Sequence, residues 1–519
     1  MDVKTKIGNN KRKFSYEDFW ERFRGSENPF EAMFSKSSLD YYYKFYENMS
    51  KSMFGYYKEL NKAFVGYWDT NEHEIGKIPD EPDVLPVNGH DIYNYVARHG
   101  MGNFHSQAIL NLDGRLDFDK LSKAVRLSVD AEPVLGCRFI KGNPPYWKRM
   151  ENIDDVEFCS FEEVSDVNEA VKRFLDSRLD MDDDPKIKIK LIRSESYDVL
   201  GFKANHACCD GSSFKDYIQL LSDIYSEIDR SDGAYIPKPA NRGRSDQDLL
   251  FNNLGIKVPN DLWIPGSDVF RPTWAFPWKQ GTSSNTRVVT CKIPPDQLDR
   301  ISIYAKSKGA TYNDLILTAY YRAMLRMGQP VYGVPMGINV TIDLRRYLPN
   351  KKTEAIRNFS GSVNASLSMV KDETFSDTLS RVVYMMNEIK SGCPGLQSAI
   401  GLERLEKISF KEVLAYYQAS SKTDKDMPNV FYGNRCIPTL SNLGILSKSL
   451  IKFGNIAATD YFIVPPVVSA PGLLLAVNTY NNVMTMAMGF FENTVLSSDV
   501  ERLLNNIRHE LLEGCNANM

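Results

Sequence analysis

His206 stands in the segment Asn-His-Ala-Cys-Cys-Asp-Gly, residues 205–211, between two runs of different pattern. The run before it, YDVLGFKAN, has the apolar composition of a strand, and the run after it has the spacing of an amphipathic helix. A neutral imidazole at such a turn can accept a proton from a hydroxyl, amine or thiol as that group attacks an electrophile. The pattern therefore predicts that His206 acts as a general base.

Asp210 and Gly211 give this turn a second physical interpretation. The carboxylate can face back toward the backbone of the histidine segment or pair with a cation behind it, and Gly211 relieves the steric demand of the turn. Taken alone, the motif is equally compatible with a structural turn. Cys208 and Cys209 add the alternative of a thiol nucleophile, but neighbours within one turn rarely point at each other, so we favour the general base.

The elements that position this turn form a first lobe over residues 81–235. The pattern predicts a strand, a turn at Asp113-Gly114 and a helix, followed by a hairpin over 186–205 with a polar turn near Ser194. A helix from about Ser213 follows, with Ser212 or Ser213 available as N-cap. Its apolar face repeats at three- and four-residue steps: Phe214, Tyr217, Leu221, Ile224 and Ile228.

Residues 286–519 show the same mixture of strands and helices and form a predicted second lobe. Strand, helix and strand patterns follow one another there, and the chain ends in a predicted helix with Ser498 as a cap. Between the lobes, residues 236–285 are rich in Pro, Gly, Asn and Trp and have little periodicity, which indicates a long connection. The fold class predicted from these patterns is α+β.

Residues 1–80 differ from both lobes in composition. Tyr, Phe, Met and Leu recur at helical spacing among Lys and Glu, so a helical, aromatic-rich extension is predicted. This extension can pack on the main body, or it can contact a membrane surface or a partner. Pro79, Pro82 and Pro86 mark the linker that follows it.

Charge and composition exclude several classes of function. The chain of 519 residues carries a formal net charge of −3, so no field attracts nucleic acid. Eight cysteines without a CxxC pair and six histidines without an HExxH motif predict neither disulfides nor a metal site. The most apolar stretch is interrupted by Pro465, Pro466 and Pro471, and no secretory signal pattern is present, so we expect a cytoplasmic protein.

Five segments resemble, in the same order, the chloramphenicol acetyltransferase-like superfamily, which includes condensation domains of peptide synthetases and alcohol acetyltransferases. They are LNLDGRLDFDKLSKAVRLSVDAEPVLGCRF, NHACCDG (its HxxxDG signature), VTIDLRRYLP, NFSG and SNLG, and the resemblance covers residues 88–515. It implies two related lobes around a central channel that is open to acceptor on one side and thioester donor on the other. Condensation domains usually carry a histidine where this chain has Asn205, so the alcohol acetyltransferases are the closer match.

The resemblance also implies roles for residues. His206 would be the catalytic base, and Asp210 would pair with Arg345, with Arg346 as a substitute, to tie the two lobes together. The backbone N–H of Gly211, Ser441 and Asn442 are candidates to stabilise an oxyanion, and Asn205 is a candidate substrate contact.

The implied function is transfer of an acyl group from coenzyme A or carrier-bound phosphopantetheine to a hydroxyl or amine of a small-molecule or lipid acceptor. No permanently bound cofactor and no metal is expected. Two alternatives remain at this point, a catalytically silent binding or assembly protein with the same fold and a thioester hydrolase.

Overall fold

Ten stretches of the chain are described by the structure, a computed structural model. They are residues 76–231, 235–244, 246–255, 274–279, 281, 283–327, 330, 335–421, 435–470 and 472–516. Residues 1–75, which make up nearly all of the predicted helical extension and its membrane-surface contact, lie outside them. The described parts of Gly76–Asn253 and Asp268–Met519 form one unit that contains both lobes.

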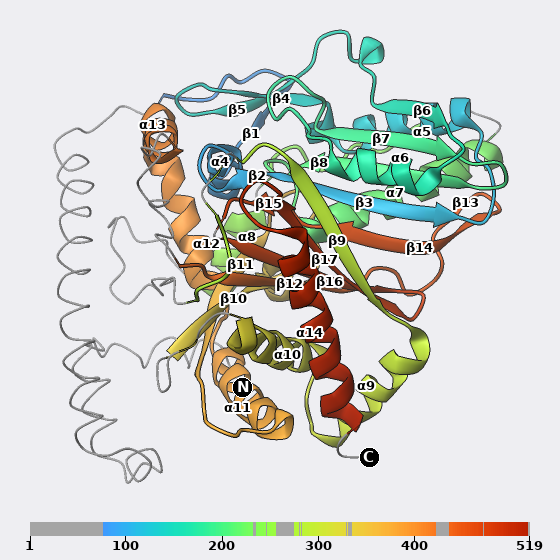
Figure 1. Cartoon of the computed structure of the whole chain (residues 1–519). Coiled ribbons are helices and arrows are strands. Elements are labelled where there is room, and N and C mark those ends of the chain that lie inside the picture. The colour runs from blue at the N-terminus through green and yellow to red at the C-terminus, as the bar shows by residue number, and fades with distance from the viewer. Residues whose placement is uncertain are drawn as a thin grey trace. The chain divides into compact units, whose positions relative to one another are not determined.

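A six-stranded mixed sheet forms the first lobe, in the order β13-β14-β3-β8-β7-β6 (Figure 1). The predicted hairpin is confirmed: β7 and β8 pair antiparallel, and Ser194 N donates to Tyr197 O across the turn at 2.9 Å. The edge strand β6 runs parallel to β7. The bounds are β3 His105–Leu112, β6 Cys159–Glu163, β7 Ile187–Arg193, β8 Asp198–Asn205, β13 Lys452–Phe453 and β14 Ile456–Val464.

Helices cover both faces of this sheet because its strands are apolar on both sides. The helices α5 (Phe118–Ala131) and α7 (Gly211–Arg230) pack their apolar stripes on one face, in a core that includes Leu121, Phe214 and Phe202. On the other face, α6 (Val167–Asp176) packs against Ile192 and Val199. The predicted face of α7 is fully buried, but its N-cap is Asp210 rather than a serine, since the Asp210 carboxylate accepts from Ser213 N at 2.8 Å.

The second lobe is also a six-stranded mixed sheet, in the order β11-β10-β12-β16-β17-β9. The inner strand β12 runs parallel to both of its neighbours, and the other pairs are antiparallel. The bounds are β9 Thr286–Ile293, β10 Pro335–Asp343, β11 Ser360–Ser368, β12 Pro438–Ile445, β16 Leu473–Tyr480 and β17 Val483–Phe491. Among the described helices, α9 Pro295–Ser307, α10 Tyr312–Met327, α11 Phe375–Ser391 and α14 Ser497–Asn516 contribute to the hydrophobic core of this lobe.

One strand crosses between the lobes. Although β14 belongs by sequence to the predicted second lobe, it pairs antiparallel with β3 of the first sheet, from Ala458 opposite Leu112 to Val464 opposite Gln107. Figure 1 shows this orange strand lying beside the blue β3. The division at residue 286 therefore does not separate the two sheets, because backbone hydrogen bonding joins segments that are almost 350 residues apart.

The predicted connection over 236–285 contains more structure than its composition indicates. It includes the helix α8 (Asp246–Leu254), and Trp274 forms an isolated antiparallel bridge with Cys436. The Arg244 guanidinium is buried and forms a salt bridge with Asp91 at 2.8 Å. The connection thus contributes a charged side chain to the interior beneath α4 (Gly89–Ala97).

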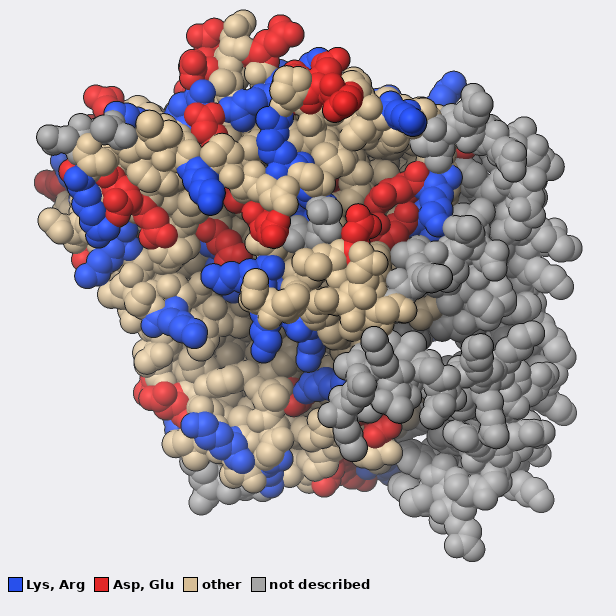
Figure 2. All heavy atoms as spheres, turned by 180° about the vertical axis from the view of Figure 1, so that it is seen from behind, with Lys and Arg blue, Asp and Glu red and all other residues tan. Residues whose placement is uncertain are grey.

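Short elements complete the described part of the chain. They are β1 Val84–Pro86, β2 Gly102–Asn103, β4 Cys137–Ile140, β5 Tyr146–Arg149, β15 Val467–Val468, α12 Leu396–Glu403, α13 Phe410–Ser421, and the 3-10 helices Pro133–Gly136, Ile153–Asp155, Leu344–Tyr347 and Arg404–Lys407. Within the described residues, none of the helices combines the length and the hydropathy that crossing a bilayer requires. On the face shown in Figure 2, acidic and basic side chains are interspersed, as the small net charge predicts.

Candidate active site

A cavity of about 130 Å³ lies between the two sheets, beside the turn that follows β8. Both lobes line it, and its wall has two chemical characters. The polar lining includes Ser106, His206, Ser212, Thr341, Asp343, Ser360, Ser441 and Asn442. The apolar lining includes Ile342, Leu443, Ile463, Pro465, Pro466, Leu474 and Ala476. An apolar wall with a few polar groups is typical of a site that binds a small organic group.

His206 is the first residue after β8, and it lines the cavity. Its backbone N–H donates to Phe104 O at 3.0 Å, and the Phe104 ring meets the imidazole edge-on, with ring centroids 6.3 Å apart. The ring atom Nδ1 is buried and has no hydrogen-bond partner among the described residues. The residue as a whole is partly exposed and lines the cavity.

The surroundings of His206 favour its neutral form. Burial lowers the pKa of His206 below its ordinary value of 6.5, and the nearby Asp210 carboxylate, the histidine's own carbonyl and Asn358 offset part of this effect. An imidazole with a lowered pKa is unprotonated at pH 7. His206 can therefore accept a proton without first losing one.

Asp210 is fully engaged by protein donors. Its Oδ2 accepts from Arg345 Nη1 at 2.9 Å and from Phe359 N at 2.8 Å, while Oδ1 accepts from Arg345 Nη2 at 3.1 Å and from Ser213 N. Burial alone would raise the pKa of Asp210, but the Arg345 charge and these hydrogen bonds hold it below its ordinary value of 3.8. The Asp210 carboxylate is thus ionised at neutral pH, and both of its oxygens are occupied by donors, so it is suited to supporting the turn.

The structure places Arg345 where the resemblance implies, and it leaves Arg346 exposed beside Tyr347. Arg345 is 4% exposed and also donates to Ser213 Oγ at 2.8 Å. Because Arg345 follows β10 and Asp210 precedes α7, this bidentate pair joins the two lobes.

Further hydrogen bonds fasten the histidine turn to residues 357–359. Ser213 Oγ donates to Arg357 O at 2.9 Å. The Asn358 amide Nδ2 donates to His206 O at 2.8 Å and to Ala207 O at 2.9 Å. The backbone of the catalytic candidate is therefore held by the opposite lobe on both sides.

The predicted oxyanion candidates divide into two groups. Gly211 and Ser441 line the cavity; Gly211 is the first residue of α7, where the helix leaves its N–H groups without an intrahelical partner, and Ser441 Oγ lies 3.3 Å from Thr341 Oγ1. Asn442 lines the cavity too, but its side chain accepts from Gly444 N at 3.0 Å and donates to Asn313 Oδ1 at 3.4 Å. Thr341 Oγ1 is the donor to Ser441 Oγ, so the remaining candidate donors are the N–H of Gly211 and the hydroxyl of Ser441 rather than the amide of Asn442.

Asn205 lies outside the cavity, unlike the prediction that it contacts substrate. It is completely buried, donates to Met181 O at 3.1 Å and accepts from Ala207 N at 3.0 Å. The residue is the last of β8, and its side chain is consumed in closing the turn.

The two cysteines of the turn are equally enclosed. Cys208 donates to Asn205 O at 3.0 Å, and a hydrogen bond with Cys208, together with burial, raises the pKa of Cys209 well above its ordinary value. Because a thiol must ionise to attack, this environment disfavours the nucleophile alternative.

Sequence reasoning missed four hydroxyls of the cavity wall: Ser106, Ser212, Thr341 and Ser360. Thr341 lies in the VTIDLRRYLP segment, two residues before Asp343, so alternation along β10 places both on one face. This two-residue alternation could have been used to predict that Thr341 lies on the same face of the strand as Asp343. Ser106 and Ser360 carried none, since nothing local indicates that β3 and β11 meet the same cavity.

No metal-binding group of three or more His, Cys, Asp or Glu side chains is present among the residues for which the structure gives positions.

Comparisons with known proteins give a family match and a shared fold. Residues 98–239, which include the His206 turn, match the condensation-domain family. A stretch of 173 residues is 23% identical to surfactin synthase subunit 2 of Bacillus subtilis (strain 168), covering 32% of this chain and 5% of that relative. The chain thus spans only a small part of the length of this curated relative.

Solved structures match over most of the chain. The trichothecene 15-O-acetyltransferase of Fusarium sporotrichioides is 13% identical, with a TM-score of 0.62 over 85% of this chain and 97% of that one. The first condensation domain of the calcium-dependent antibiotic synthetase has a TM-score of 0.59 at 14% identity, over 84% and 97% of the two chains. Polyketide synthase associated protein 5 from Mycobacterium tuberculosis has a TM-score of 0.57 at 14% identity, over 83% and 98%.

The predicted fold class, α+β with two such lobes, is confirmed by these matches. Residues 98–239, which contain the histidine turn, are therefore similar to the condensation-domain family, and the chain shares a two-lobed fold with condensation domains and an acetyltransferase.

Proposed function

We propose that the protein transfers an acyl group from a thioester to a hydroxyl or amine acceptor, with His206 as general base. The observation that carries the proposal is a partly exposed imidazole that lines a cavity between two lobes. The donor is coenzyme A or the phosphopantetheine of a carrier protein, and the acceptor is a small molecule or a lipid.

The reaction requires one proton to move out and back. His206 Nε2 takes the proton of the acceptor hydroxyl or amine as the acceptor oxygen or nitrogen bonds to the thioester carbonyl carbon. The tetrahedral oxyanion collapses, the carbon–sulfur bond breaks, and the imidazolium returns the proton to the departing thiolate. No acyl-enzyme is formed, in keeping with the engaged, buried thiols of Cys208 and Cys209.

Two donors are available for the oxyanion. The N–H of Gly211 lies at the positive end of the α7 dipole, and Ser441 presents a hydroxyl from the opposite lobe that accepts a hydrogen bond from Thr341 on the adjacent strand. The apolar wall formed by Ile463, Leu474 and neighbouring residues suits the hydrocarbon part of the acyl group or the acceptor.

A panel of thioesters and acceptors tests the proposal. The protein is incubated with acyl-coenzyme A and acyl-pantetheine substrates of increasing chain length, together with primary alcohols and amines. Thiol release is measured with a colorimetric assay, and the products are identified by mass spectrometry. We expect thiol release to match ester or amide formation. Release of free acid without acceptor would instead identify a hydrolase, and a silent panel would contradict the proposal.

Gly211 provides a test of the cavity geometry. A Cβ atom at this position would lie 2.7 Å from Leu443 Cδ2, and Leu443 lines the cavity. Gly211→Ala is therefore expected to displace Leu443, to lower acyl transfer about tenfold, and to cost only about 1 kcal/mol of unfolding free energy. Adding Leu443→Ala should restore activity. A double variant no more active than Gly211→Ala would show that this contact does not shape the site.

A further inference from the structure

Polar side chains form a continuous surface on three adjacent strands of the second sheet, β11, β10 and β12. Thr341 on β10 lies opposite Ser362 on β11. Asn339, two residues earlier on β10, lies opposite Asn364 on one side and Thr439 on the other. We call this surface the polar face, and its members are Asn339, Thr341, Ser362, Asn364, Thr439 and Ser441.

The polar face is the side of these strands that points away from the hydrophobic core of the second lobe. The residues that alternate with its members are buried in that core: Ile338, Val340, Val363, Ala365 and Leu440. All members of the polar face are partly exposed, and two of them, Thr341 and Ser441, line the cavity. The polar face is therefore a solvated surface that continues from the cavity along the strands.

The neighbouring half of the same side of the sheet is apolar. Leu474 and Ala476 on β16 line the cavity, and Ala487 on β17 packs with Ile109 and Phe462 of the first sheet. Apolar side chains thus hold the lobes together on this side of the sheet. Packing between the lobes does not explain why the other half is polar.

Hydrogen bonds within the polar face do not explain it either. The contacts between its members are long: Thr341 Oγ1 donates to Ser441 Oγ at 3.3 Å, and Asn339 Nδ2 donates to Thr439 Oγ1 at 3.5 Å. The buried atoms Asn339 Oδ1 and Asn364 Oδ1 have no hydrogen-bond partner in the part of the chain that the structure describes. Because an unpaired buried polar atom destabilises a folded protein, internal pairing is not the reason that asparagines stand at these two positions.

The polar face begins close to the His206 turn. Asn358 Nδ2 donates to His206 O at 2.8 Å, and Ser360, the first residue of β11, lines the cavity. Ser362 and Asn364 follow at two-residue steps, so Asn364 lies about 13 Å beyond Ser360 along the strand. A molecule that extends along the polar face therefore has one end at the cavity that His206 lines.

The chemistry of the polar face defines the kind of molecule that it can bind. Its side chains are hydroxyls and carboxamides, which carry no charge and both donate and accept hydrogen bonds. We propose that the polar face binds the acceptor of the acyl group, and that this acceptor is an uncharged molecule with several hydroxyl or amide groups and a length of about 13 Å. Its reacting hydroxyl lies at His206, and the apolar wall of Leu474 and Ala476 is left for the acyl group.

This inference rests on the proposed function and narrows its acceptor. A site that is built to form hydrogen bonds rejects a molecule that lacks the matching groups, because its polar groups are then left unpaired. A long-chain alcohol would leave the polar face in that state. We therefore expect a polar acceptor to be preferred over a lipid.

Calorimetric titration of the full chain in the absence of thioester tests the class of acceptor. Methyl glucoside and methyl maltoside form a hydroxyl-rich pair of probes, N-acetylserinamide and N-acetylseryl-glycinamide form an amide-rich pair, and 1-octanol is the apolar probe. In one pair or both, we expect the longer member to bind about tenfold more tightly than the shorter one, because it reaches further along the polar face. Both members of that pair should bind more tightly than 1-octanol.

The outcome of the titration separates this inference from the proposed function. A protein that binds a polar pair in this way but transfers no acyl group would refute only the proposed function. Strongest binding of 1-octanol, or no gain in affinity with length in either pair, would overturn the inference even if the protein is an acyltransferase.

Two variants test whether the polar face is the surface that binds. Thr439→Val and Asn364→Leu remove hydrogen-bonding groups at nearly constant volume. Each should weaken the binding of the tightest polar probe by about two- to tenfold and leave the affinity for 1-octanol unchanged. Unchanged affinity for the polar probe in both folded variants would contradict the proposal.

The matched control is Thr479→Val on β16. Thr479 is also partly exposed, but it lies two residues after Val477 and shares the side of the sheet that packs in the core of the second lobe. The control should bind the polar probe with wild-type affinity. A loss of affinity as large as that of Thr439→Val would show that binding does not depend on the polar face.

Discussion

Replacing His206 with alanine is expected to lower the rate of acyl transfer by about 10²–10⁴-fold, the range that general-base catalysis contributes. The variant loses the imidazole that lines the cavity, and the neighbouring Asp210 carboxylate cannot replace it as base because it is occupied by four donors. The loss should appear in kcat rather than in KM, since the imidazole acts in the transition state. Steady-state thiol release with product detection measures it.

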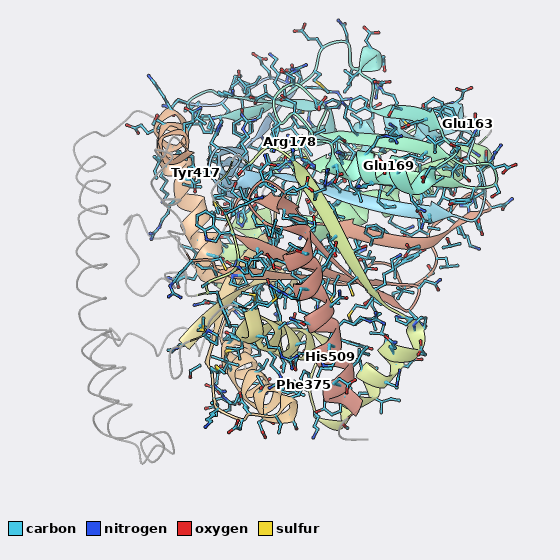
Figure 3. All side chains as sticks on the ribbon, viewed as in Figure 1. Glu163, Glu169, Arg178, Phe375, Tyr417 and His509 are labelled. Atoms are coloured by element: carbon cyan, nitrogen blue, oxygen red, sulfur yellow. The ribbon has the colours of Figure 1, made fainter. Side chains whose placement is uncertain are left out.

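The matched control for this prediction is His509→Ala. His509 lies on α14 (Figure 3) and does not line the cavity. Both variants should melt close to the wild-type temperature, and only the first should lose activity. His206→Ala retaining more than half of the wild-type turnover would exclude the imidazole as base.

Replacing Asp210 with alanine is expected to lower the free energy of unfolding by roughly 3–5 kcal/mol, because a buried guanidinium loses its main partner. Arg345 is 4% exposed and, within the part of the chain that the structure describes, would keep only Asp343, at 3.1 Å, as a charged partner. Ser213 N and Phe359 N would lose their acceptor as well. Chemical denaturation measures the change, and activity should fall with it because the same pair supports the His206 turn.

The control for this pair is Asp296→Ala on α9. Asp296 is 74% exposed and lies 3.7 Å from Arg300. An exposed pair contributes little, so the control should change stability by no more than about 0.5 kcal/mol. A loss of similar size in both variants would show that the Asp210–Arg345 pair is not special.

Acid pH gives an independent test of the same pair. The pKa of Asp210 in the folded protein lies below its ordinary value of 3.8. The stability that this ionisation contributes is therefore present above about pH 4 and is lost as the pH falls toward the lowered pKa. Asp210→Asn removes the titrating group, so its unfolding free energy should decrease less than that of the wild type over this acid range.

Local patterns were sufficient to predict the individual elements that matter for the site. The hairpin over 186–205, the apolar face of α7 and the strands of both lobes follow from two- and three-to-four-residue periodicities. The HxxxDG spacing placed His206 at a strand-to-helix turn. These features depend on residues close in sequence, so a single sequence contains them.

The directions in which side chains point at the site were harder to predict than the helices and strands. Asn205 and His206 are adjacent, yet one closes the turn and the other lines the cavity. Asn442 lines the cavity, but Asn313 and Gly444 occupy its amide. Asp210, rather than a serine, caps α7. Each outcome depends on which neighbour offers a donor or acceptor in three dimensions.

The sequence by itself determined the α+β class, the two-lobed order of strands and helices, and the position of His206 at a strand-to-helix turn. Only the tertiary structure decided that β14 joins the first sheet, that Arg345 rather than Arg346 meets Asp210, and that Asn358 lies against His206. The physical reason is that periodicity specifies which face of an element is apolar. The register between strands distant in sequence, and the hydrogen bonds of buried polar groups, are fixed only when the two lobes pack together.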